Sequence, residues 1–184
     1  MKNFQWLMVF TICFTVQNIS GQGSPDFDGS VDLGQLEYEW LNEASGLAAS
    51  KNNENVLWSH NDSGDDNVIY ALNLHGEHLG IYTIDGASAR DWEDIAVGPG
   101  PVEGESYIYI GVIGDNYSQY DEKYIYRVPE PDVDANQEPV ETTLTGVETI
   151  TYQYPDGNRD SETLMVDPLT KDIYLVSKRE LEDI

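Results

Sequence analysis

The chain has 184 residues, which is about the length of one domain. It carries 34 acidic residues against 9 lysines and arginines, a formal net charge of −25. This charge disfavours binding to nucleic acid or to an anionic membrane surface, and it favours binding of cations. The one cysteine, Cys13, excludes an internal disulfide and a thiolate metal site, so stability must come from an apolar core or from bound metal.

The N-terminal residues 1–21 predict a secretory signal peptide. Lys2 precedes an apolar run from Trp6 to Val16, and Ser20 and Gly21 supply the small residues of a cleavage site. The run is shorter than the ~20 residues of a membrane-spanning helix; a retained anchor helix is the alternative. We therefore expect a secreted, soluble protein. Residues 22–36 are rich in Gly, Ser and Asp and predict a flexible lead-in.

Three copies of one pattern follow, after a predicted strand from Leu36 to Leu41 that alternates apolar and polar residues. Each copy has a short strand, a turn and a second strand. The first copy predicts strands over 45–50, 56–60, 67–74 and 78–84. The second predicts strands around 95–97 and over 107–111, 124–128 and 146–154, with a Pro- and acid-rich surface loop over 129–141. The third predicts strands around 164–166 and over 173–177.

A four-stranded unit that recurs every ~40–50 residues is typical of a β-propeller blade. We therefore predict an all-β fold, a β-propeller of four-stranded antiparallel blades over residues 37–184, with blades at about 43–86, 91–154 and 160–184. About two and a half blades are present, whereas closed propellers have ~4–8. We expect the chain to be a fragment of a longer protein, with a smaller open fold as the alternative. The alternative to the propeller itself is a β-sandwich. The aromatic residues at equivalent places, Trp58, Tyr109 and Tyr174, are predicted to pack in the core.

The motifs resemble those of a poorly characterised family of secreted β-propeller proteins. They are Ser45-Gly46-Leu47-Ala48-Ala49-Ser50, Leu57-Trp58-Ser59-His60-Asn61-Asp62-Ser63-Gly64, Asp91-Trp92-Glu93-Asp94-Ile95-Ala96-Val97-Gly98-Pro99-Gly100, Ile113-Gly114-Asp115-Asn116 and Tyr154-Pro155-Asp156-Gly157. The resemblance covers roughly residues 43–180 and implies a propeller of about six blades. A looser similarity to phytase-like and gluconolactonase-like propellers implies calcium at the propeller axis.

Acidic residues lie just before the first strand, or just after the second strand, of each copy. Because the innermost strands of neighbouring blades line one axis, we expect these side chains to meet across blades. Calcium takes 6–8 oxygen ligands from carboxylates, amides and carbonyls. The predicted metal ligands are Asp62, Asp65, Asp66, Glu93, Asp94, Asp115, Asn116 and Glu162, with Asp160 as a further candidate. The alternative is that these residues only form turns, because Asp and Asn cap their own backbone.

Other polar residues near these acids have two interpretations each. His60 is either a general base or ligand, or a hydrogen-bonding residue between blades. Arg90, and Lys178 with Arg179, are predicted to neutralise nearby acids rather than to bind an anion. Asn61 and Asn116 begin glycosylation sequons, of which we expect at most one to be used.

These features predict a secreted, acidic, non-catalytic protein that binds calcium in an extracellular or biomineral matrix. Its expected partners are cations or a mineral surface. The alternative is a metal-assisted hydrolase of phosphate or carboxylic esters. In that case Glu93, Asp94 and Asp115 would hold the ion and His60 would be the base.

Overall fold

The computed structural model describes residues 29–62 and 64–178. The predicted signal peptide, and residues 22–28 of the predicted lead-in, lie outside these residues. The chain divides into two units, Met1–Asp32 and Leu33–Ile184, and every strand belongs to the second unit. The described residues form strands and no helix, and so include no helix that could cross a membrane.

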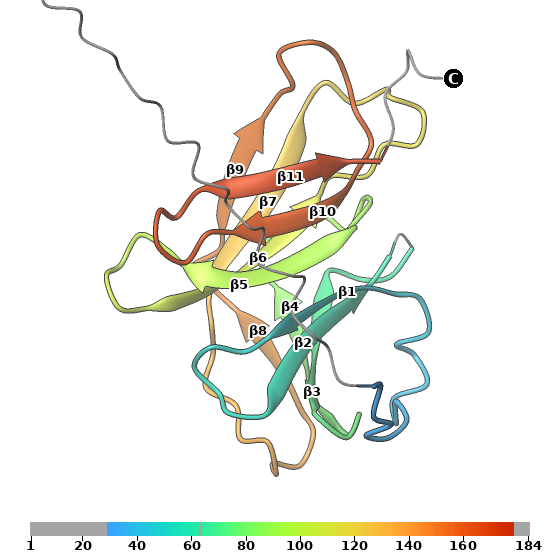
Figure 1. The fold of residues 1–184 in the computed structure, drawn as a ribbon, viewed down its shortest axis with the longest axis vertical. Coiled ribbons are helices and arrows are strands. Elements are labelled where there is room, and N and C mark those ends of the chain that lie inside the picture. The colour runs from blue at the N-terminus through green and yellow to red at the C-terminus, as the bar shows by residue number, and fades with distance from the viewer. Residues whose placement is uncertain (1–28, 63, 179–184) are drawn as a thin grey trace, which may run out of the picture. The chain divides into compact units, whose positions relative to one another are not determined.

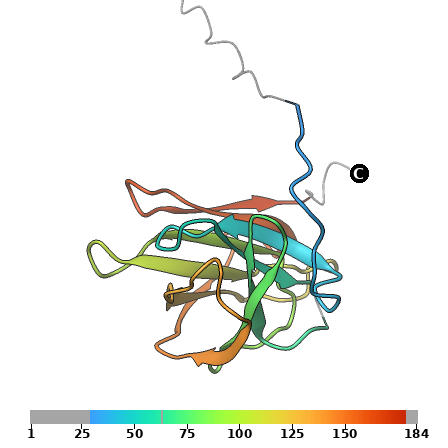
Figure 2. The ribbon, with the colours of Figure 1, turned by 90° about the horizontal axis from the view of Figure 1, so that it is seen from below.

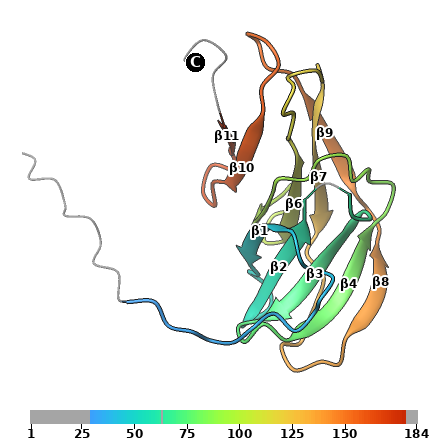
Figure 3. The same cartoon turned by 90° about the vertical axis from the view of Figure 1, so that its right-hand side faces the viewer.

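The first sheet has the order β1-β2-β3-β4-β8. Its strands are β1 (Ala44–Ala49), β2 (Val56–Asn61), β3 (Val68–Asn73), β4 (His78–Ile84) and β8 (Val140–Leu144). The first four are consecutive and antiparallel. The fifth, β8, pairs with β4 in parallel and forms the outer edge, as Figure 3 shows.

The second sheet has the order β5-β6-β7-β9, and the third consists of β10 and β11. The strands are β5 (Asp94–Pro99), β6 (Ser106–Val112), β7 (Lys123–Pro129), β9 (Glu148–Tyr152), β10 (Ser161–Val166) and β11 (Ile173–Ser177). All pairs in these two sheets are antiparallel. The first strands of the three sheets, β1, β5 and β10, lie side by side (Figures 1 and 2).

The first two strands of each sheet pair in the same register. In each sheet the first strand pairs with the second so that Ala48 faces Trp58, Ala96 faces Tyr109, and Met165 faces Tyr174. Trp58 and Tyr109 are buried as predicted. Tyr174 is 50% exposed, so its predicted place in the core is wrong. In the described residues β11 has no third strand beside it to cover that side chain.

The turns before β2 and β11 are also built alike. Asn55 and Lys171, each three residues before the paired aromatic, adopt left-handed φ values of 62° and 65°. The side chains of Ser50 and Asp167 accept hydrogen bonds from the backbone N–H three residues later, at 2.8 Å in both turns. The first and third copies therefore share their turn conformation as well as their strands.

The sheets pack face to face, and the core lies between them. One cluster includes Trp58 and Ile69 of the first sheet with Ile108 and Ile110 of the second. A second cluster joins Ala96 and Tyr109 of the second sheet to Leu164 of the third. β-branched and aromatic residues dominate the strands, as expected for side chains that fit a pleated, buried surface. This packing holds the beginnings of β1, β5 and β10 next to one another.

Two further predictions about the fold are wrong. No strand forms over 36–41; instead, Tyr38 and Leu41 pack against the outer face of the first sheet. The 129–141 segment is not a simple surface loop, because Glu130 and Val133 are buried and the segment leads into β8. Because β8 joins β4, the first sheet has a fifth, parallel strand that the four-stranded antiparallel prediction lacks.

Candidate metal centre

A β-bulge lies at the same place in β1 and β10, the first strands of the first and third sheets. The β1–β2 register skips Ser45, and the β10–β11 register skips Glu162. In the second sheet, the Glu93 N–H donates to Gly111 O at 3.0 Å, although Gly111 is paired with Asp94. A bulge places two residues against one and redirects the side chain of the extra residue. The structure thereby brings Glu93 and Glu162 to equivalent positions beside one another.

Five carboxylates gather at these bulges. Asp62, Asp91 and Glu93 form one triad, and Glu93, Asp160 and Glu162 form a second. Within each triad, one carboxylate oxygen of each residue lies within 4.8 Å of the other two. Two oxygens bound to one calcium ion lie at most about 4.8 Å apart, since each Ca–O distance is about 2.4 Å. The spacing of both triads is therefore compatible with shared coordination of a calcium ion.

Glu93 belongs to both triads and is the most unusual residue of the centre. It is 5% exposed, yet its carboxylate has no hydrogen bond or ion pair within the part of the chain that the structure describes. Burial, followed by the negative charges of Glu162 and Asp62, raises the pKa of Glu93 to about 8. A buried carboxylate without a partner is costly, because it loses its hydration. A cation at this point would remove that cost.

Asp91 shares this environment. Its pKa is raised, first by burial and then by the charges of Asp62 and Asp160. The backbone of Gly114 lies directly against both side chains. A Cβ at Gly114 would stand 2.2 Å from Glu93 Oε1 and 2.4 Å from Asp91 Oδ2. Only glycine therefore leaves these two carboxylates in place.

Lys178 forms ion pairs with two residues of this centre. Its Nζ lies 2.7 Å from Glu162 Oε1 and 4.0 Å from Asp160 Oδ2. The prediction that Lys178 neutralises nearby acids is confirmed, while Arg179 lies outside the described residues. Arg90 stacks over Tyr120, with its guanidinium carbon 4.0 Å from the ring centroid. Its charge lowers the pKa of Asp91, but burial raises that pKa by more.

Several predicted ligands are held away from the centre by structural bonds. Asp94 accepts hydrogen bonds from Ile95 N and Leu164 N, at 2.9 and 2.8 Å, and so ties β5 to β10. Asp65 accepts hydrogen bonds from the side chains of Asn61 and Tyr70, both at 2.7 Å. The neighbouring Asp66 is exposed. None of these three belongs to either triad.

Asp115 is also occupied, by a fully buried ion pair with Lys123 at 2.7 Å. Its oxygens further accept from Gln119 N and Tyr120 N. Burial would raise the pKa of Asp115, but these hydrogen bonds lower it below its ordinary value. The adjacent Asn116 is exposed and belongs to neither triad.

His60 is fully buried between the sheets. Its Nδ1 lies 2.6 Å from Asn61 O, and its ring meets Trp92 edge to face. Nε2 is buried without a hydrogen-bond partner in the described residues, and burial lowers the pKa of the imidazole. The imidazole of His60 is thus neutral and has no exposed surface. These properties favour a hydrogen-bonding role between the sheets over a role as the base for a soluble substrate.

The two sequons differ in accessibility. Asn61 is 7% exposed, and its side-chain amide donates to Trp40 O and Asp65 Oδ2, both at 2.7 Å. Asn116 is exposed in the turn after β6. Glycosylation needs an asparagine at the surface, so the difference in exposure favours Asn116 over Asn61.

The sequence analysis missed Asp91 as a ligand. A signal for it exists, because Asp91 and Glu93 have the same two-residue spacing as Asp160 and Glu162 at the beginning of their strands. In the second and third copies the acid two residues earlier is thus as regular as the glutamate itself. Comparison of the chain with protein-family models, curated proteins and solved structures found no match. The resemblance to secreted propellers therefore stays a prediction.

Proposed function

We propose that this chain is part of a secreted, acidic β-propeller that binds calcium at the five-carboxylate centre and serves in an extracellular or mineralised matrix. The observation that carries the proposal is Glu93, a buried carboxylate grouped with four others, to which the described residues give no hydrogen bond and no ion pair. Calcium is the preferred ion because all the side-chain ligands are hard oxygen donors and no thiolate is present.

The propeller architecture is supported by the arrangement of the sheets. Three successive sheets pack face to face, and each begins with a strand that lies beside the first strand of the next. The bulges in β1 and β10, and the hydrogen bond from Glu93 N–H to Gly111 O before β5, mark equivalent positions in the three sheets. In a propeller these positions surround the axis, where an ion can be shared between blades.

The structure gives no specific support to the alternative of an ester hydrolase. That alternative requires His60 as a base beside an ion held by Glu93, Asp94 and Asp115. His60 is fully buried, and Asp94 and Asp115 are bonded to backbone amides and to Lys123. A binding role needs none of these groups and uses the residues that do gather.

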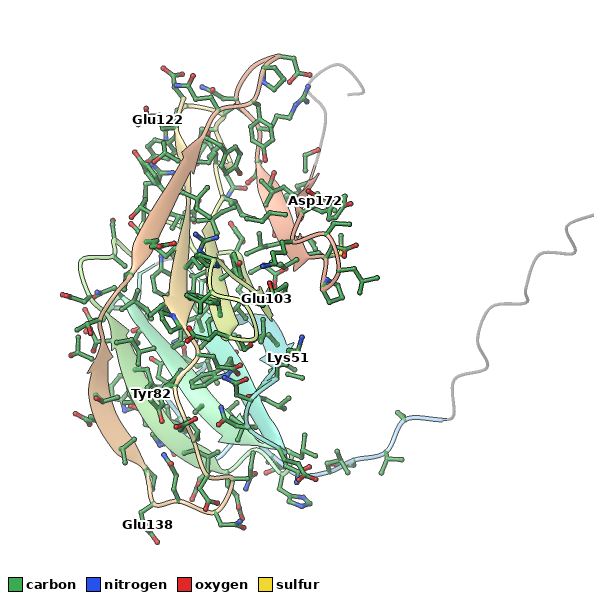
Figure 4. The ribbon with its side chains drawn as sticks, turned by 90° about the vertical axis from the view of Figure 1, so that its left-hand side faces the viewer. Lys51, Tyr82, Glu103, Glu122, Glu138 and Asp172 are labelled. Atoms are coloured by element: carbon green, nitrogen blue, oxygen red, sulfur yellow. The ribbon has the colours of Figure 1, made fainter. Side chains whose placement is uncertain are left out.

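Isothermal titration of calcium chloride into the chain tests the proposal. We expect saturable binding, and we expect Glu93→Gln to weaken it by about tenfold or more because one charged ligand in the middle of the centre is lost. The control is Glu103→Gln, an equal change in the exposed turn between β5 and β6 (labelled in Figure 4), which should bind as the parent does. Absence of binding and of any thermal stabilisation by millimolar calcium would contradict the proposal.

The matrix role has a separate readout. Adsorption of the chain to calcium phosphate particles should fall as phosphate or salt is raised, because an acidic surface binds a calcium mineral through charge. If the protein stayed in solution at low salt, a mineral surface would be ruled out as its partner. That result would not contradict the proposal of a calcium centre.

A further inference from the structure

A pocket of about 230 Å³ lies where the first turns of the three sheets meet. These turns join β1 to β2, β5 to β6 and β10 to β11, so the pocket and the five carboxylates lie at opposite ends of β1, β5 and β10. Lys51 lines the pocket from the first turn, Ser106 from the end of the second, and Lys171 from the third. Hydrogen-bond donors from three sheets therefore surround one pocket, which we call the turn pocket.

Lys51 and Lys171 differ from the other basic residues in the described part of the chain. Four of those residues form ion pairs with carboxylates: Lys123, Arg127, Arg159 and Lys178. A fifth, Arg90, stacks over Tyr120. Neither Lys51 nor Lys171 forms an ion pair with a described residue. Lys171 Nζ donates to Gly100 O at 3.0 Å, which uses one of its three N–H groups. Two cations without a carboxylate partner thus line the same pocket.

Ser106 adds an independent observation that points to a ligand. Its side chain is 4% exposed, and its Oγ is buried without a hydrogen-bond partner in the described residues. A buried hydroxyl group in this state is unfavourable, because it has given up its hydrogen bonds to water. The backbone O of Ser106 accepts a hydrogen bond from Glu130 N at 2.9 Å, which fixes the residue at the pocket wall. An oxygen atom bound in the pocket would give the hydroxyl an acceptor.

We propose that the turn pocket binds a phosphate group through Lys51, Lys171 and Ser106. An ammonium group is a compact charge that suits phosphate oxygens, whereas a planar carboxylate is matched best by the fork of an arginine, and no arginine of the described residues lines the pocket. Donors on three separate turns suit an anion whose oxygens point in several directions. The inference goes beyond the calcium function and does not rest on it, because no residue of the five-carboxylate centre lines the pocket.

Acidic residues at the turn pocket limit the affinity that we expect. Glu103 (labelled with Lys51 in Figure 4) and Glu105 also line it, and the chain as a whole is strongly negative. Glu105 accepts a hydrogen bond from Tyr107 OH at 3.3 Å, and neither glutamate forms an ion pair with a described residue. Both ammonium groups therefore remain available to an anion. We expect binding at millimolar phosphate, because the charge of the whole chain opposes the local attraction.

Titration of sodium phosphate into the ¹⁵N-labelled full chain tests the inference, with amide NMR shifts as the readout, in EDTA and at constant ionic strength. We expect saturable shifts at the three turns. Lys51→Met and Lys171→Met should each weaken binding by about fivefold or more, since each removes one charge beside the anion. Ser106→Ala should weaken it without any change in net charge. The control Arg159→Met removes an equal charge beyond the other end of β10 and should bind phosphate as the parent does.

Circular dichroism verifies folding, and Lys51→Gln and Lys171→Gln serve if the Met variants misfold. No saturable shift in the parent overturns the inference. So does equal affinity in the parent and in the three pocket variants, or an equal loss in Arg159→Met, because net charge alone would then explain the effect. A parallel titration with the peptide Gly-phosphoserine-Gly identifies the source of the phosphate. Tighter binding than that of inorganic phosphate indicates a phosphorylated partner, and weaker binding indicates free or mineral phosphate. All of these results leave the calcium proposal to its own test.

Discussion

The buried carboxyl group of Glu93 should make the calcium-free protein less stable as the pH rises. Its folded-state pKa of about 8 lies above the ordinary value of 4.5. Below about pH 4.5 the group is protonated in both the folded and the unfolded chain, so stability is fully present. Between about 4.5 and 8 only the unfolded chain releases the proton, and stability falls; above about 8 the loss is complete.

Glu93→Gln should remove this part of the pH dependence. In EDTA at pH 8.5 we expect the variant to be more stable than the parent by a few kcal/mol, since each pKa unit is worth about 1.4 kcal/mol. The two should differ little at pH 4.5. Urea unfolding followed by tryptophan fluorescence measures the free energy of unfolding of both proteins. Subtracting one value from the other cancels the contributions of the other acidic residues, which both proteins share. Equal pH slopes for the two proteins would show that Glu93 is ionised and satisfied in the folded chain.

At the scale of structural elements, the 129–141 segment is fixed to the first sheet through Glu130. This carboxylate is 7% exposed and accepts hydrogen bonds from Trp58 Nε1 at 2.8 Å and Ser50 Oγ at 2.6 Å. It also accepts from the backbone amides of Lys51 and Asn52, at 3.3 Å each. One side chain thereby provides the hydrogen-bond acceptor for the turn between β1 and β2 and for the buried indole N–H of Trp58.

Glu130→Ala should destabilise the fold by about 2–4 kcal/mol, because it leaves a buried indole N–H and the turn amides without an acceptor. The matched control is Glu138→Ala, at an exposed position of the same segment (Figure 4), for which we expect a change within about 0.5 kcal/mol. Chemical denaturation of both variants provides the comparison. Similar midpoints would mean that the contacts of Glu130 do not hold the segment.

The strands could be predicted from the sequence because their apolar and aromatic runs are bounded by turn residues in three similar copies. The equivalence of Trp58 and Tyr109 could be predicted too, and the two residues hold the same place in the strand register. The contacts of 129–141 could not be predicted, because Glu130 meets residues more than 70 positions away in the chain. Charge alone could not separate Glu93 from Asp115 either. Only the fold shows that Asp115 already has Lys123 as its partner.

Across the whole molecule, a bound ion would join the first and second sheets, which contribute residues to the centre from separate parts of the chain. Asp62 follows β2, whereas Asp91 and Glu93 precede β5. A ligand that binds only the folded state stabilises it by mass action, by about 2.7 kcal/mol at 100 times its dissociation constant. The local effect should be greatest where the ion links the two sheets.

Hydrogen exchange measured with and without calcium resolves this effect along the chain. In the parent protein we expect slower amide exchange in peptides that cover the end of β2 and the start of β5, and little change in β10 and β11. These two strands form a separate hairpin, and Tyr174 and Val176 of β11 are about half exposed. Protection of β10 in the parent would place the ion at the second triad, because only that triad draws two of its ligands from the third sheet and its preceding residue.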